Sequence, residues 1–300
     1  MYRRIASTIA LALVVAAGAA PPAVAQLSQN LGPLSGDNAK RYLAPLSDAM
    51  SGTMNSAIFT SGNVPLLGLN FSVGVKVMGV KFADSDRLYT PTDPPGFTST
   101  APIQQVPTVI GGPDAVAQSG QGGSTMYYPG GFDIGEFAFA APQLNVGSLL
   151  GTRAVVRWFA HDFATDNLIS KISFFGIGAQ HSISQYMPAL PLDLAAGIFY
   201  QTFKINSDLI DIKTLHVDVT GSKSFGLLQP YGAIGIDSFK MKASYEDANN
   251  PGNNVAVDFD RTNHIHLTAG LLASLAFVKI HGEANLAATK GVAVGLSFGL

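Results

Sequence analysis

Residues 292–300 read Val292-Ala293-Val294-Gly295-Leu296-Ser297-Phe298-Gly299-Leu300. Large apolar side chains occupy every even position of this stretch, and small or polar residues occupy every odd position. A period of two is typical of a β-strand that has one apolar face and one polar face. The stretch therefore predicts a strand that presents a continuous apolar face.

The same alternation recurs along the chain and predicts ten strands. They cover residues 66–82, 133–147, 152–160, 169–183, 191–205, 212–224, 228–245, 255–273, 276–287 and 290–300. Strands of about nine to eleven residues suit a barrel that spans a bilayer, whereas the strands of a soluble sandwich are usually shorter. Short turns alternate with longer polar connections, expected at residues 161–167, 206–211 and 246–254. The predicted fold class is all-β, a closed antiparallel transmembrane β-barrel.

Residues 83–132 decide the strand count. They are rich in Pro, Gly, Ser and Thr, and we expect them to form one long extracellular loop. A loop of that length can contain a hairpin, which would raise the count from ten strands to twelve.

The N-terminal region precedes the first predicted strand and carries two signals. Arg3 and Arg4 come before an apolar run that ends near Ala20, and Ala23-Val24-Ala25 is a small-residue cleavage motif. We expect residues 1–25 to be a signal peptide cleaved after Ala25 rather than a retained anchor, because the apolar run is short. Residues 26–62 then predict an amphipathic helix, short or broken at Pro45, that plugs a barrel formed by residues 63–300.

The composition excludes several classes of function. Only 13% of residues are charged and the net charge is −2, so no basic face is available for a nucleic-acid partner. The chain has no cysteine, which excludes disulfides, thiolate metal sites and a cysteine nucleophile. We expect no cofactor.

The interior-facing phase of three predicted strands collects ionisable side chains. These candidate lumen residues are His216, Asp218, His264, His266, Lys279, His281 and Glu283. Imidazoles and carboxylates on neighbouring strands can converge on a metal or an acid–base site. Because barrel interiors are polar by default, we predict instead a polar lumen that contacts a ligand, without a metal centre.

Two histidines are the local candidates for catalysis. His181 lies beside Ser182 and Ser184, and His161 lies beside Asp162. Neither has an identifiable third partner, and adjacent residues of a strand point to opposite faces. We therefore predict no catalytic residues and no enzyme.

Several short motifs resemble an uncharacterised family of bacterial outer-membrane barrel proteins known only as a domain of unknown function. They are Tyr42-Leu43-Ala44-Pro45-Leu46, Val106-Pro107-Thr108-Val109-Ile110-Gly111 and Pro142-Gln143-Leu144-Asn145-Val146-Gly147. The resemblance implies a barrel and brings no known activity. A looser similarity, in architecture only, is to outer-membrane transporters of long-chain fatty acids and aromatic hydrocarbons, which also place a plug before the barrel.

The C-terminal strand also resembles the signal by which the outer-membrane assembly machinery recognises barrel precursors, with Leu300 where Phe is usual. The expected location is thus the outer membrane of a Gram-negative bacterium, and the expected partners are its lipid and that machinery. For function, the sequence favours a passive channel or transporter for small hydrophobic or amphipathic molecules. The alternatives are a structural or surface-binding barrel and a lipid-modifying enzyme.

Overall fold

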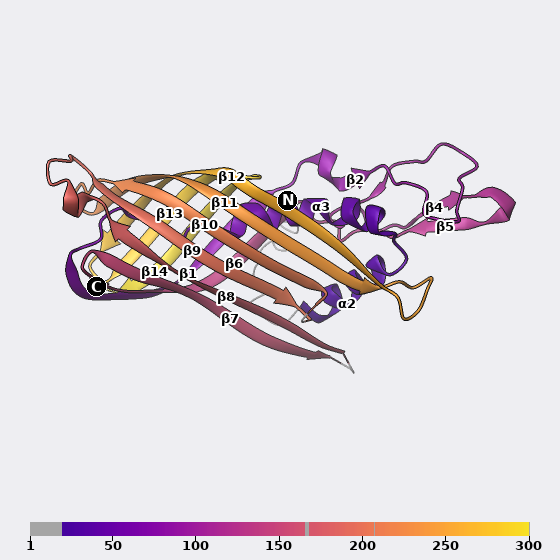
Figure 1. The fold of residues 1–300 in the computed structure, drawn as a ribbon, viewed down its shortest axis with the longest axis horizontal. Helices are drawn as coiled ribbons and strands as arrows, with labels where there is room; N and C mark the ends of the chain where they lie inside the picture. Colours follow the sequence, from indigo (N-terminus) through magenta and orange to yellow (C-terminus); the bar gives the residue numbers. More distant parts are fainter. Residues whose placement is uncertain (1–19, 166–167, 207, 300) are drawn as a thin grey trace.

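The computed structural model describes residues 20–165, 168–206 and 208–299. In this part of the chain ten antiparallel strands form one closed barrel, in the order β1-β14-β13-β12-β11-β10-β9-β8-β7-β6 (Figure 1). Their bounds are β1 Leu67–Lys81, β6 Glu136–Leu149, β7 Thr152–Thr165, β8 Leu168–Ser182, β9 Asp193–Ile205, β10 Ile210–Ser222, β11 Leu228–Glu246, β12 Asn254–Leu275, β13 Val278–Leu286 and β14 Lys290–Gly299. The predicted fold class is confirmed.

The final strand closes the barrel. On β14, Leu296 pairs with Val75 of β1, and Ser297 pairs with Gly74. Val292, Val294, Leu296 and Phe298 are all exposed on the outside, whereas Ala293 and Ser297 are buried. The period of two in the sequence therefore separates an outer apolar face from an inner face of small residues. Leu300 lies outside the described residues.

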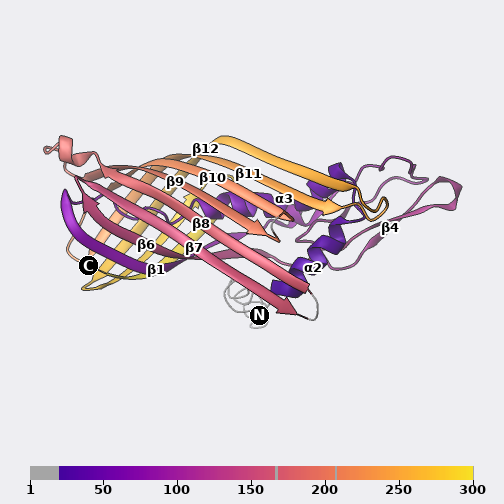
Figure 2. The same ribbon diagram turned by 60° about the horizontal axis from the view of Figure 1, so that its bottom comes forward.

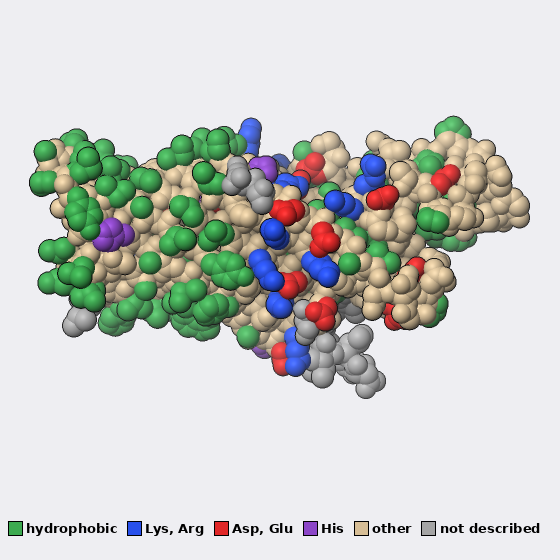
Figure 3. Space-filling view, in the orientation of Figure 1, with side chains coloured by type: hydrophobic (Ala, Val, Ile, Leu, Met, Phe, Trp, Pro, Cys, Tyr) green, Lys and Arg blue, Asp and Glu red, His purple; other side chains and the backbone are tan. Residues whose placement is uncertain are grey.

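The outer surface carries an apolar band of bilayer dimensions. On β10, the exposed Leu215, Val217 and Val219 lie between Lys213 and Lys223. About 10 residues at roughly 3.3 Å each, tilted by about 40°, span roughly 25 Å, which is the height of the apolar band of a transmembrane barrel. Figure 3 shows apolar side chains over one half of the barrel and a belt of charged side chains beside them.

The two ends of the barrel differ. At the turn end, residues 150–151, 183–192, 223–227 and 276–277 connect the strands. At the loop end, the connections include residues 82–135, 206–209, 247–253 and 287–289. The turn end also holds the end of β14 (Figure 1).

The predicted long connection at residues 161–167 is wrong, because β7 continues to Thr165 and β8 begins at Leu168. The predicted loop at 206–211 is likewise shortened to residues 206–209. Polar residues there continue the barrel wall beyond the apolar band. Ion pairs join neighbouring strands at this level, with Lys171 3.7 Å from Asp162, and Lys240 3.3 Å from Asp260.

The long loop adds no strand to the barrel. In residues 83–132, β2 (Leu88–Tyr89) pairs with β3 (Val106–Pro107), and β4 (Val116–Ser119) pairs with β5 (Thr125–Tyr128). The short helical turns are η1 (Asp84–Arg87) and η2 (Gln121–Gly123), with η3 (Ser184–Tyr186) at the turn end. The barrel of the described chain therefore has ten strands and not twelve.

Within the described residues, two helices precede β1, namely α2 (Ala20–Leu31) and α3 (Gly36–Met54). The predicted break at Pro45 does not occur, since α3 continues through this buried proline. Its side chains are buried against β12, β1, β6 and β14, so tertiary packing offsets the cost of the proline. No helix of the described residues is long and apolar enough to span a membrane. The predicted signal peptide lies mainly outside the described residues.

Candidate functional site

The barrel interior is occupied by α3 and by residues 55–62 (Figure 2). We call residues 55–62 the plug segment. Arg157 of β7 is completely buried and donates to the carbonyl oxygens of Met54 at 3.1 Å and Ser56 at 2.9 Å. Gln143 of β6 donates to the Ile58 carbonyl at 3.0 Å. Wall side chains thus satisfy backbone groups that have no strand partner.

The other side of the barrel holds the plug segment as well. Glu283 of β13 accepts the N–H of Ala57 at 2.7 Å. Ala57 has a φ of 56°, a left-handed conformation that is costly for a residue with a Cβ atom. The contact with Glu283 therefore holds the chain in a strained turn inside the barrel.

A glycine in the wall makes room for one plug side chain. A Cβ atom at Gly197 of β9 would overlap the Phe59 ring and the Asp218 carboxylate. Phe59 packs edge-to-face on Phe199, with the ring centroids 6.4 Å apart. The wall and the plug segment are therefore complementary in shape at this level.

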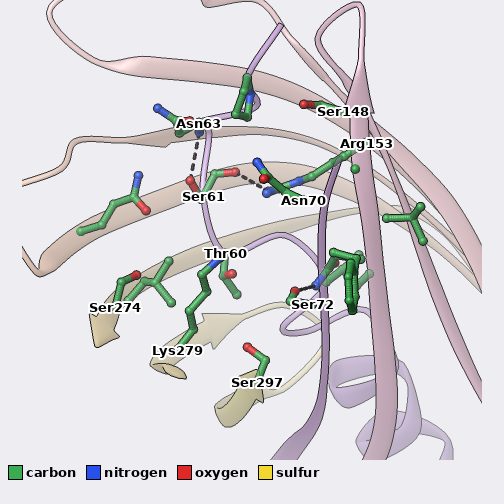
Figure 4. Close-up of a pocket in the computed structure, with 18 of the residues that line it drawn as sticks. Thr60, Ser61, Asn63, Asn70, Ser72, Ser148, Arg153, Ser274, Lys279 and Ser297 are labelled. Carbon is green, nitrogen blue, oxygen red and sulfur yellow. Dashed lines mark hydrogen bonds between the residues drawn. The ribbon is translucent and has the colours of Figure 1, made fainter. Parts of the chain in front are cut away.

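A cavity of about 330 Å³ lies between the plug segment and the turn end (Figure 4). Three cationic side chains line it: Lys76 of β1, Arg153 of β7 and Lys279 of β13. Arg153 also donates to the Ser61 carbonyl at 2.8 Å. The other lining residues are hydroxyl, amide, glycine or apolar residues, with no carboxylate among the described ones. The cavity is chemically suited to an anionic group.

A hydrogen-bonded row of buried polar side chains runs across the inner face of β10, β11, β12 and β13, on the side of the barrel opposite β7. His216 Nδ1 of β10 lies 2.6 Å from Asp237 Oδ1 of β11, and His266 Nδ1 of β12 lies 2.7 Å from Asp237 Oδ2. His266 Nε2 lies 3.0 Å from Asn285 Oδ1. Asn285 then donates to Glu283 at 2.8 Å. This row of hydrogen bonds therefore ends at Glu283, the carboxylate that accepts the N–H of Ala57.

At the loop end a tyrosine fastens α3 to the long loop. The Tyr42 hydroxyl donates to the Gly130 carbonyl at 2.9 Å and accepts from Asn30 at 2.9 Å. Burial raises the pKa of Tyr42 to about 12, and burial also raises the pKa of Tyr89 nearby. Both phenols are therefore neutral at physiological pH. Their burial shows that side chains fill the interior at the loop end.

The structure places most predicted lumen residues inside. His216, Asp218, His266, His281 and Glu283 are buried, and Lys279 is half-buried at the cavity. His264 is exposed and does not join them. The pairing of β11 with β12 has a bulge beside His264, between the pairs Asp237–His264 and Phe239–Arg261. This bulge interrupts the alternation from which the position of His264 was predicted.

The charged interior residues that the sequence pattern did not reveal include Lys76, Arg153, Arg157 and Asp237. Their signal was a charged residue in the interior phase of an apolar strand, as with Lys76 between Val75 and Val77. The side chains of Lys76 and His281 fill the interior space beside Gly295. His181 contacts Thr152 at 2.7 Å and Tyr186 at 3.0 Å.

Comparison with known proteins gives a family but no activity. No curated protein matches the chain. A mutant of the Rh. blastica porin is 12% identical, with a TM-score of 0.17, over 78% of this chain and 100% of that chain. The Ralstonia pickettii toluene transporter TbuX is 10% identical, with a TM-score of 0.20, over 81% and 92%. TM-scores this low do not establish a shared fold, and the barrel is defined by its own strand pairing. The model of a family of unknown function (DUF6588) matches residues 3–300, and the chain therefore belongs to this family.

Proposed function

We propose that the protein is a plugged conduit of the bacterial outer membrane for small amphipathic molecules. The observation that carries this proposal is a closed barrel whose interior holds a plug segment above a cationic cavity. In the proposed orientation the turn end, where β14 also ends, faces the periplasm, because the periplasmic turns of transmembrane barrels are short. The cavity then opens toward the periplasm.

The lining of the cavity suggests the class of molecule. Lys76, Arg153 and Lys279 attract a carboxylate or a phosphate. Ile58 and Leu272 offer apolar surface. A molecule with one anionic end and one short apolar part satisfies both kinds of wall.

Passage requires the plug segment to move, since α3 and residues 55–62 fill the interior. The contacts that hold residues 54–62 include many hydrogen bonds from wall side chains, for example Gln201 to the Met54 carbonyl at 2.9 Å. Water can replace such bonds at a modest net cost of about 1 kcal/mol each. The segment can therefore be released without opening the barrel wall.

A disulfide lock tests the proposal. Thr214 of β10 donates to the Asn55 side chain at 2.9 Å, and the chain contains no cysteine, so Asn55→Cys with Thr214→Cys introduces one defined pair. In liposome swelling with hexanoate, we expect uptake by the reduced double variant and loss of uptake after oxidation. Single-cysteine variants are the controls. Equal uptake in both redox states, or no uptake by the unmodified protein, would contradict the proposal.

A second function, surface binding, is favoured by one feature. The sheets β2–β3 and β4–β5 project beyond the loop end of the barrel (Figure 1). If this surface binds a partner, replacing residues 114–128 by a short Gly-Ser linker should abolish cell-surface attachment while hexanoate uptake remains. Unchanged attachment would remove this alternative.

A further inference from the structure

We propose that His216, Asp237 and His266 form a binding site for a divalent transition-metal ion of the zinc type. The three residues come from the adjacent strands β10, β11 and β12, and all three are buried. Their ligand atoms lie within 4.8 Å of one another. Two imidazoles and one carboxylate are a ligand set that zinc takes in proteins, with a further position open for water.

Hydrogen bonding fixes the proton on His266. Asn285 donates through its Nδ2 to Glu283 at 2.8 Å, so the Asn285 Oδ1 must be the acceptor that faces His266 Nε2. Thr268 also donates to this Oδ1, at 2.7 Å. His266 Nε2 therefore carries a hydrogen, and the neutral ring has its lone pair on Nδ1.

That lone pair faces a second acceptor. His266 Nδ1 lies 2.7 Å from Asp237 Oδ2, and two acceptors at this separation need a cation between them. Either a proton makes His266 an imidazolium, or a metal ion binds both atoms. His216 Nδ1 lies 2.6 Å from the other oxygen of the same carboxylate, so both imidazoles flank Asp237, and one ion placed between them can bind all three side chains.

The local charge favours the metal ion. Asp218 lies on β10 beside the triad of His216, Asp237 and His266, with its Oδ2 3.9 Å from His216 Nε2. The buried Oδ1 of Asp218 has no hydrogen-bond partner among the described residues. Asp218 and Asp237 are 4% and 2% exposed. Neither forms an ion pair with Lys or Arg within the described chain. One divalent ion neutralises both carboxylates, and buried carboxylates otherwise carry a large desolvation cost.

The surrounding groups have the form of outer-shell support. Asn285 orients His266, and Thr268 in turn donates to Asn285. Such partners fix the tautomer and the ring orientation of metal-binding histidines. Because Asn285 also bonds Glu283, which holds Ala57, an ion at this site would be linked to the plug segment.

Metal titration of the full-length protein, folded in detergent, tests the site without any transport measurement. We expect one Co²⁺ per chain, with visible d–d absorption, displaced by Zn²⁺ at pH 7.5. Asp237→Asn and His266→Gln should each weaken Zn²⁺ binding at least tenfold. His181→Gln, which changes a histidine outside the triad, should bind as the unmodified protein does.

Heat-modifiable gel migration shows whether each variant is folded. If a variant fails to fold, Co²⁺ binding by the unmodified protein still decides the test. Absence of d–d absorption after Co²⁺ addition to folded protein would overturn the metal site and leave His266 as an imidazolium. Binding that persists in Asp237→Asn, or that is lost in His181→Gln, would also overturn it. Failure here leaves the disulfide-lock experiment unaffected.

Discussion

Arg157 in the barrel wall donates a buried hydrogen bond from Nη2 to the backbone carbonyl of Ser56 in the plug segment, at 2.9 Å. The same guanidinium bonds the Met54 carbonyl and the Gln143 side chain. One wall residue therefore holds the point where α3 ends and the plug segment begins.

Replacing this arginine should loosen the plug. Arg157→Met leaves the Ser56 carbonyl buried without its donor, so we expect a loss of about 3 kcal/mol in the free energy of unfolding. The temperature at which the folded gel band disappears reports the change. Lys171→Met, at an exposed wall position, is the control. An unchanged transition in Arg157→Met would show that the contact does not stabilise the fold.

Gly197 should be intolerant of any side chain. In Gly197→Ala the added methyl group overlaps the Phe59 ring, and overpacking of this kind costs about 2 kcal/mol. We expect displacement of Phe59 and a higher basal conductance in planar bilayers. Gly282→Ala is the matched control, since a Cβ there meets no atom within 4 Å. Equal conductance in the two variants would argue against a plug seated on Gly197.

Strand alternation allowed the barrel to be predicted because each strand has an exposed apolar outer face and an inner face of small or polar residues. The predicted strand 228–245 and the observed β11, Leu228–Glu246, differ by one residue. Alternation failed where the outer face is polar, and Asp162 was therefore assigned to a loop although it pairs with Lys171 across β7 and β8.

The interior was harder to predict, because side-chain partners depend on strand register. His216 and His266 were recognised, but Asp237, which joins them, was not. Its assignment requires knowing that β11 lies between β10 and β12 with His216 opposite Asp237. The bulge that exposes His264 likewise has no signal in a single sequence.

The Tyr42 hydroxyl gives a pH-dependent prediction. The folded-state pKa of about 12 lies above the ordinary value of 10.0. The corresponding stability is therefore fully present below pH 10 and is lost as the pH rises through 12, by about 3 kcal/mol. Tyr42→Phe should be about 1 kcal/mol less stable than the unmodified protein at pH 7, and this difference should shrink and reverse by pH 12.

Urea unfolding in detergent, followed through Trp158 fluorescence at pH 7, 10 and 12, measures this difference. Tyr127→Phe, on an exposed tyrosine of the long loop, is the control. A difference between Tyr42→Phe and the unmodified protein that stays constant with pH would contradict the role given to the buried phenol.

The cationic cavity predicts anion preference. Lys279→Glu reverses one of three cationic charges there, so hexanoate should permeate about tenfold more slowly, as expected for a change of about 1.4 kcal/mol. Lys290→Glu, an exposed position at the loop end of β14, is the control. Equal slowing by both variants would point to a general surface-charge effect and not to the cavity.

The single tryptophan of the chain allows a direct test of the membrane-spanning barrel. Trp158 is 45% exposed on the outside of β7, within the apolar band that we place in the bilayer. In liposomes of brominated phosphatidylcholine, the folded protein should show strong quenching of Trp158 fluorescence relative to unbrominated lipid. Fluorescence that is equal in the two lipids, with the protein folded and bound to the vesicles, would contradict a membrane-spanning barrel.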